Sequence, residues 1–241
     1  YQGDYIRKLA ASLRDESPDV IKREEADAIK LCSAYGVSKV LEWIADDLEA
    51  FGINFDNWFS EQSLYDRDMV TTELAKLAQK GLSYEQEDAL WLRTTDFGDD
   101  KDRVLIKSDG SPTYFASDVA YHMEKFERGF ETVIDVWGAD HHGYVPRMKA
   151  VLAGLGHEPE DLDVLLIQMV NLLRDGQPFT MGKRSGNFIT LREVVDEVGR
   201  DACRFIFLMR RSDSHLDFDL ELAKQQSNDN PVYYVQYAHA R

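Results

Sequence analysis

The sequence predicts an α/β protein in which a parallel sheet with flanking helices follows a mostly helical first part. Three observations support this prediction. Residues 1 to about 82 carry apolar side chains at helical spacing. From residue 115 onward, helical and strand patterns alternate, which is typical of βαβ units and indicates parallel strands. After residue 190 the pattern becomes helical again and stays so to the end of the chain.

The first predicted segment, residues 1–110, is helical with a short β-hairpin. Gly52 and Gly81 are plausible C-terminal stops for its helices. Two short strands are expected at residues 89–93 and 103–107, joined by a polar turn. The run Ser-Asp-Gly-Ser-Pro that follows the second strand is the clearest breaker in the chain. We therefore place a domain boundary there.

The second predicted segment, residues 111–211, contains the alternating pattern. Its expected elements are a helix at 115–127, a strand at 132–137, a helix at 145–155, a strand at 164–173, and helices at 191–198 and 200–209. Ligands of such sheets bind beyond the carboxyl ends of the strands. The third segment, residues 212–241, is expected to form helices around 219–226 and 232–241.

Composition limits the function classes. The net charge of −16 argues against a protein that simply coats nucleic acid. No apolar run approaches the roughly 18 residues of a membrane span, so we expect no membrane partner. The chain does not begin with a signal-peptide pattern. Cys32 and Cys203 lie far apart, which favours a reducing compartment over a structural zinc site, and no metal site is predicted.

A cationic loop at residues 177–187 follows the last predicted strand. It reads Gln-Pro-Phe-Thr-Met-Gly-Lys-Arg-Ser-Gly-Asn. Adjacent cations, glycines and hydroxyls suit a polyphosphate ligand. The alternative is a solvated surface turn. A Walker phosphate loop is excluded, because Gly176 lies one residue too early and Arg184 stands where a hydroxyl is needed.

A second polar cluster follows the strand predicted at 132–137. Gly138 would let a nucleotide lie on bare backbone, and Asp140 could accept bonds from ribose hydroxyls. A helix-start turn with an Asp cap is an equal alternative. A metal site at His141 and His142 is weaker, because neighbouring residues point apart and no further ligand is near.

Two other groups of residues are candidates for binding. Tyr114 and Asp118 are four apart on a predicted helix, and a carboxylate beside a phenol suits a guanidinium; the alternative is a solvated Asp. Tyr234 and Gln236 in the last helix could stack on or bond to nucleic acid. A packing helix is at least as compatible with those residues.

Taken together, these segments resemble the bacterial arginyl-tRNA synthetases, a family of class I aminoacyl-tRNA synthetases. The resemblance rests on the order and spacing of motifs that run nearly from end to end. They are the segments at 1–6, 99–105, 109–118, 137–144, 181–187 and 234–241. The cationic loop is similar to the Lys-Met-Ser-Lys-Ser signature of class I, with Thr180 in place of the first Lys, Gly182 in place of the Ser, and the second Lys retained as Lys183.

The resemblance implies the second half of a Rossmann-like catalytic sheet and an enzyme that ligates arginine to tRNA(Arg) through an arginyl-adenylate. It implies ATP with Mg²⁺, a cytoplasmic location and, we expect, a monomer. The implied roles are as follows: Lys183 and Arg184 are catalytic; Gly138, Asp140, His141, Met181, Gly182 and Lys183 bind ATP; Tyr114, Asp118 and His142 bind arginine; Tyr234, Gln236, His239 and Arg241 bind tRNA.

One departure from the family pattern bears on activity. The His-Ile-Gly-His-like signature of the family does not occur in this sequence. We therefore expect the internal part of a catalytic domain that does not activate arginine alone. Two alternatives remain: another class I synthetase such as the cysteinyl enzyme, which the cysteine count opposes, and a non-catalytic arginine-binding or scaffold paralogue, which the retained Lys183, Asp118 and Asp140 oppose.

Overall fold

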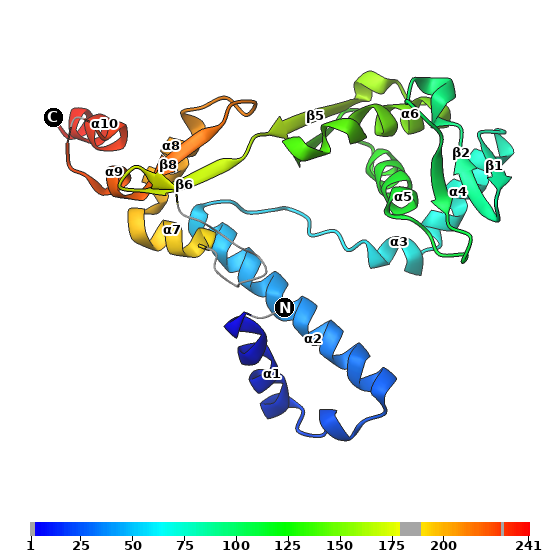
Figure 1. Ribbon diagram of the computed structural model, residues 1–241, viewed down its shortest axis with the longest axis horizontal. Helices are drawn as coiled ribbons and strands as arrows, with labels where there is room; N and C mark the ends of the chain where they lie inside the picture. The colour runs from blue at the N-terminus through cyan, green and yellow to red at the C-terminus, as the bar shows by residue number, and fades with distance from the viewer. Residues whose placement is uncertain (1–2, 179–188, 228) are drawn as a thin grey trace. The chain divides into compact units, whose positions relative to one another are not determined.

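The computed structural model describes residues 3–178, 189–227 and 229–241 (Figure 1). By internal contacts the chain divides into two compact units. We call residues 57–169 with 212–214 the central unit, and residues 1–56, 170–211 and 215–241 the flanking unit. This division follows compactness, whereas the predicted segments 1–110, 111–211 and 212–241 follow motifs and stay a prediction.

The central unit contains four α-helices and five strands among the described residues. In chain order its elements are α3 (Gln62–Asp66), α4 (Met69–Gln79), β1 (Ser83–Gln86), β2 (Ala89–Leu92), η2 (Thr94–Phe97), β3 (Arg103–Ile106), α5 (Tyr114–Glu127), β4 (Val133–Gly138), η3 (Ala139–Tyr144), α6 (Val145–Leu155), η4 (Pro159–Asp161) and β5 (Leu162–Ile167).

The antiparallel sheet β1-β2-β3 contains the predicted hairpin and one further strand. The sequence analysis did not predict β1. The turn between β1 and β2 consists of Glu87 and Asp88, both with positive φ angles of 53° and 58°. Two such residues form the kind of tight turn that joins paired antiparallel strands. The acidic run at 85–88 therefore contains a strand end and a turn.

The strands β4 and β5 pair in parallel, with Val133 opposite Leu162 and Gly138 opposite Ile167. The helix α6 lies between them in the chain, so the predicted βαβ order is confirmed (Figure 1). The main core of this unit includes the fully buried Leu77, Leu105 and Leu152. The polar cluster after β4 therefore follows the carboxyl end of a parallel strand, as predicted.

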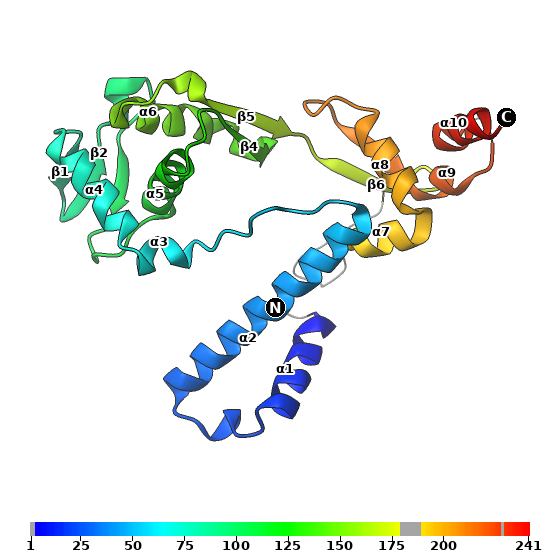
Figure 2. The ribbon, with the colours of Figure 1, turned by 180° about the vertical axis from the view of Figure 1, so that it is seen from behind.

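The flanking unit is mostly helical. Its elements are α1 (Asp4–Glu16), η1 (Val20–Lys22), α2 (Glu25–Phe51), β6 (Val170–Arg174), β7 (Gln177–Pro178), α7 (Leu191–Val198), α8 (Arg200–Leu208), β8 (Leu216–Asp219), α9 (Leu220–Lys224) and α10 (Pro231–Ala240). In Figures 1 and 2, α1 folds back beside α2.

A second sheet lies in this unit, in the order β7-β6-β8. The single strand predicted at 164–173 is wrong in extent, because it is two strands, β5 and β6, that pair with different partners. The strand β8 was also not predicted; it pairs with β6 in parallel.

Contacts distant in sequence tie α2 to α7 and α8 within the flanking unit. The Arg192 guanidinium lies 3.0 Å from Asp47, and Arg204 donates to the carbonyl oxygens of Phe51 and Gly52 at 3.2 and 3.1 Å. Gly52 ends α2 with a φ of 82°, a conformation that glycine adopts without strain, so the predicted stop is confirmed. None of the helices that the structure describes combines the length and apolar character needed to cross a bilayer.

Candidate active site

A cavity of about 520 Å³ lies at the carboxyl end of β4 in the central unit. Its walls come from the first turns of α5, the last residues of β4, and η3. The lining residues are Tyr114, Asp118, Val136, Trp137, Gly138, His141 and Tyr144. Four of the predicted site residues thus line one cavity: Tyr114, Asp118, Gly138 and His141. This volume lies within the usual range of small-molecule sites.

Local hydrogen bonds fix the start of α5, which carries Tyr114 and Asp118. The Thr113 side chain caps the helix by accepting from the Ala116 N–H. Its hydroxyl also lies 2.9 Å from the carbonyl oxygen of Val104 in β3. Thr113 thereby anchors the helix start to the neighbouring strand. Because Tyr114 and Asp118 are one turn apart, both side chains face the cavity.

Asp118 is half-buried, and Tyr144 of η3 donates a hydrogen bond to its Oδ2 at 2.5 Å. Burial raises the pKa of the Asp118 carboxyl above its ordinary value, and the bond from Tyr144 opposes that shift. Burial also raises the pKa of the Tyr144 phenol, and the charge of Asp118 raises it further. The phenol is therefore the donor and the carboxylate the acceptor.

A buried ionic cluster lies behind Asp118. His122 Nδ1 lies 2.7 Å from the carbonyl oxygen of Asp118, and His122 Nε2 lies 2.7 Å from Asp135 Oδ2. Lys125 donates to the other Asp135 oxygen at 2.6 Å. Burial opposes the charge of Asp135, but the bonds from His122 and Lys125 outweigh it and lower the pKa of this carboxyl. His122 is only 3% exposed, so it belongs to this buried cluster and does not share the open face of α5 with Tyr114.

The polar residues after β4 are exposed. A Cβ added at Gly138 would lie 2.6 Å from an Asp140 oxygen, so the Asp140 side chain folds back over bare backbone. The first turn of η3 has no side-chain cap, so the alternative reading of Asp140 as a helix cap is wrong. His141 Nε2 is 3.8 Å from Asp140 Oδ1. His142 lies outside the cavity lining and contacts the carbonyl oxygen of Ala139 at 3.1 Å.

The cationic loop falls outside the described residues. The predicted roles of Met181, Gly182, Lys183 and Arg184 therefore stay predictions. In the part of the chain that the structure does describe, no group of three or more His, Cys, Asp and Glu side chains could hold a metal ion.

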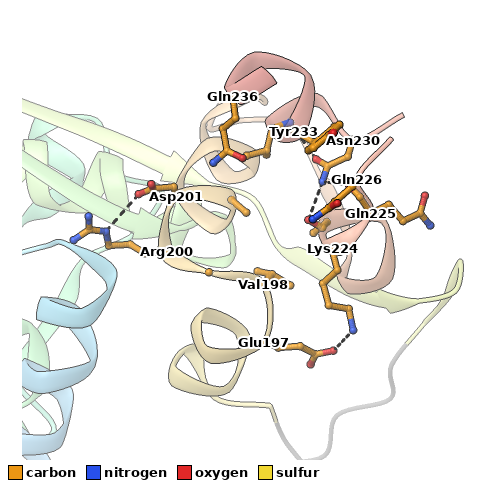
Figure 3. Close-up of a pocket in the computed structure, with 14 residues that line it drawn as sticks. Glu197, Val198, Arg200, Asp201, Lys224, Gln225, Gln226, Asn230, Tyr233 and Gln236 are labelled. Atoms are coloured by element: carbon orange, nitrogen blue, oxygen red, sulfur yellow. Dashed lines mark hydrogen bonds and ion pairs between the residues drawn. The ribbon is translucent and has the colours of Figure 1, made fainter. Parts of the chain in front are cut away.

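A second cavity, of about 550 Å³, lies in the flanking unit among α7, α8, α9 and α10 (Figure 3). Lys224 on its wall is paired with Glu197 at 2.8 Å, and Arg200 with Asp201 at 3.5 Å. Gln236 is the one predicted tRNA-binding residue that lines this cavity. Tyr234, His239 and Arg241 are exposed on α10 and at its end, which leaves them accessible but gives them no shared cavity among the described residues.

Sequence reasoning did not assign Tyr144, Trp137 or Asp135 to this site. A signal for Asp135 was present: it alternates with the exposed Ile134 and Val136 of β4, so it shares the buried face of the strand with Val133. A charge on that face needs a partner. Tyr144 carried no comparable signal, because its contact with Asp118 depends on how η3 and α5 meet.

The geometry defines a class of protein: an α/β protein with a carboxylate-bearing cavity at the end of a parallel strand. The family described as "tRNA synthetases class I (R), catalytic domain" matches residues 22–219. Because this match covers most of the sequence, the chain belongs to the arginyl-tRNA synthetase family of class I catalytic domains.

Individual relatives agree with this assignment. The chain is 66% identical to the arginine–tRNA ligase of Syntrophotalea carbinolica and 62% identical to that of Citrifermentans bemidjiense. Each alignment covers 100% of this chain and 44% of the relative, so the chain spans less than half the length of these curated proteins.

Solved structures agree as well. A Campylobacter jejuni protein provisionally described as an arginyl-tRNA synthetase matches 100% of this chain and 52% of its own, with 43% identity and a TM-score of 0.91. The Thermus thermophilus arginyl-tRNA synthetase, at 18% identity and a TM-score of 0.67, has the same fold; the match covers 90% of this chain and 47% of that one. The predicted α/β class is confirmed.

Proposed function

We propose that the full-length protein is an arginine–tRNA ligase that acts in the cytoplasm as a monomer. It activates arginine with ATP to arginyl-adenylate and transfers the arginyl group to tRNA(Arg). The observation that carries this proposal is the half-buried Asp118, whose Oδ2 accepts from a phenol within a cavity at the end of β4. A carboxylate in that setting suits a planar cation such as a guanidinium.

Family membership supports roles for the other residues. Tyr114 lies one helical turn from Asp118 on the same cavity wall and is placed to contact the arginine side chain. Gly138 and His141 line the cavity, and with Asp140 they would take the nucleotide. His142 would assist arginine binding from outside the lining.

Catalysis in this proposal consists of positioning and electrostatics. The arginine carboxylate attacks the α-phosphorus of ATP, and pyrophosphate leaves. Lys183 and Arg184 would stabilise charge on the phosphates, with the Met181-Gly182 backbone near the adenine. Mg²⁺ would arrive with the nucleotide and neutralise phosphate charge. Tyr234, Gln236, His239 and Arg241 would contact the tRNA.

The test measures arginine binding to the full-length protein by calorimetry, with citrulline as a ligand of the same shape but no charge. Asp118→Asn should weaken arginine binding at least about 30-fold, because it leaves a desolvated guanidinium without a charged partner. Asp163→Asn, which changes an exposed carboxylate on β5, is the control and should bind normally.

Two outcomes would contradict the proposal. One is equal binding of arginine and citrulline by the unaltered protein. The other is normal arginine binding by Asp118→Asn. ATP–pyrophosphate exchange in the presence of tRNA then measures activation itself, and a protein that binds arginine without exchange would be the non-catalytic paralogue.

A further inference from the structure

Tyr144 is held rigidly in the cavity wall. Its ring meets the edges of Trp137 and Phe115, with centroids 5.7 and 6.1 Å away and interplanar angles of 67° and 84°. The Arg147 guanidinium lies over the ring at 4.5 Å. Aromatic and cation–π contacts on three sides leave the ring little freedom. Its hydroxyl therefore has a fixed position, 2.5 Å from Asp118 Oδ2.

The hydroxyl is a permanent donor. Because burial and the neighbouring carboxylate raise the pKa of Tyr144, the phenol stays protonated throughout the neutral range. Asp118 can then only accept at Oδ2. In the part of the chain that the structure describes, no hydrogen bond reaches Asp118 Oδ1, and Tyr144 is the one side chain that donates to this carboxylate. The carboxylate thus presents one oxygen to Tyr144 and keeps the other for a ligand.

The backbone of Asp118 is anchored separately. His122 Nδ1 contacts its carbonyl oxygen at 2.7 Å, and His122 is itself held by Asp135. The backbone and the carboxylate of Asp118 are thus both held before a ligand arrives. This reduces the conformational entropy that ligand binding would otherwise cost.

We propose that Tyr144 is a positioning residue for arginine recognition, whose hydroxyl occupies Oδ2 of Asp118 and fixes the carboxylate plane so that Oδ1 faces the guanidinium. The inference rests on the proposed function, because it takes arginine as the ligand. Tyr144 acts through Asp118, whether or not it contacts the ligand itself. The phenol is neutral, so it orients the carboxylate without cancelling the charge that the ligand needs.

The arrangement has a consequence for pH dependence. The charged and titratable groups that act most strongly on Asp118 are Tyr144 of η3, His122 and Lys125 of α5, and Glu61 before α3, and Tyr114 and His141 line the same cavity. Burial raises the pKa of Asp118, whereas the Tyr144 hydroxyl lowers it. Removing the hydroxyl should therefore raise this pKa further. Since only the ionised carboxylate pairs with a guanidinium, arginine binding should then fail at a higher pH.

The experiment compares Tyr144→Phe with Tyr65→Phe in the full-length protein. Tyr65 is a matched control, because its hydroxyl also contacts a side chain of α5: it lies 2.5 Å from Ser117 Oγ. Among the described residues, the Asp118 carboxylate accepts from Tyr144 and not from Tyr65. Arginine affinity is measured by calorimetry from about pH 4, near the ordinary pKa of an aspartate, to about pH 8. Tyr144→Phe should bind arginine about tenfold more weakly, and its acid midpoint should move to higher pH. Tyr65→Phe should change neither.

The outcomes separate this inference from the proposed function. If Asp118→Asn abolishes binding but Tyr144→Phe matches the unaltered protein in affinity and midpoint, the inference is wrong and the function stands. If the unaltered protein does not bind arginine, the function is wrong. If both tyrosine variants weaken binding equally, Tyr144 has only a structural role. The KM for ATP in the exchange assay is the control for misfolding of Tyr144→Phe. In a correctly folded variant it should change less than the KM for arginine.

Discussion

Asp135 offers the sharpest test of how the central unit is held together. Its side chain is 8% exposed and accepts from His122, whose side chain is 3% exposed, and from Lys125, whose side chain is 12% exposed. Asp135→Ala would leave an imidazole and an ammonium buried without their shared partner. Breaking a buried pair in this way costs about 3–5 kcal/mol. Domains are stable by about 5–15 kcal/mol, so roughly a fifth or more of the stability is at stake.

Urea unfolding followed by fluorescence would measure this loss. With a denaturant slope of about 1–3 kcal/mol per molar urea, the midpoint for Asp135→Ala should fall by about 1 M or more. Asp163→Ala is the matched control, because Asp163 is exposed on the neighbouring strand β5. This substitution should change the free energy of unfolding by less than about 0.5 kcal/mol. A midpoint for Asp135→Ala equal to that of the control would refute the assigned role of the cluster.

The same variant has a defined pH dependence. Folding lowers the pKa of Asp135 below its ordinary value of 3.8. Its contribution to stability is therefore fully present above that value and is lost as the pH falls below it. The difference between the unaltered protein and Asp135→Ala should be constant near neutral pH and shrink below about pH 4. A difference that grew in acid would contradict the pairing.

Two further predictions concern the core and a helix cap. Leu105→Ala should cost about 2–5 kcal/mol of unfolding free energy, because Leu105 is fully buried in the main core, whereas Leu165→Ala, at an exposed site, should cost much less. Thr190→Ala should cost about 1 kcal/mol, because Thr190 caps α7 in a reciprocal pair with Glu193; melting curves would measure the loss, and Thr190→Ser should restore the cap.

Much of the fold could be predicted because local signals agreed with the final structure. The helix predicted at 191–198 has those bounds in α7, where Thr190 begins it and Gly199, with a φ of 86°, follows it. The helix predicted at 115–127 differs from α5 by one residue at its start. Periodic apolar positions and terminal residues suffice for such helices.

The strands β1 and β8 could not be predicted by the same reasoning. They read Ser-Tyr-Glu-Gln and Leu-Asp-Phe-Asp, with few residues that favour strands. Each exists because a partner strand lies beside it: β2 pairs with β1 and β6 pairs with β8. Pairing between strands is a tertiary interaction, which overrides weak local preference.

The site was predictable in its residue types but not in its connections. Tyr114 and Asp118 were identified from helical spacing, Gly138 from its place after a strand, and His141 from the resemblance to the arginyl-tRNA synthetases. The link from Asp118 to Tyr144 spans 26 positions in the sequence and depends on η3 folding back toward α5. Spacing along one element cannot reveal such a contact. The Tyr144 hydroxyl could therefore be identified as the donor to Asp118 only from the three-dimensional structure.

Asp118, the carboxylate of the proposed arginine site, differs from the structural ion pairs of the central unit in its partner. Among the other buried and half-buried acids of the central unit, Asp102 accepts from the hydroxyls of Tyr84 and Thr95, whereas four pair with a cation: Glu73 with Lys76, Asp99 with Arg103, Glu124 with Arg128, and Asp135 with Lys125. Those charges are already balanced. Asp118 also has a neutral phenol as its hydrogen-bonded side-chain partner, and unlike Asp102 it lines the cavity at the end of β4. A half-buried carboxylate that is oriented but not neutralised retains its attraction for a cation, which is the property that an arginine site requires.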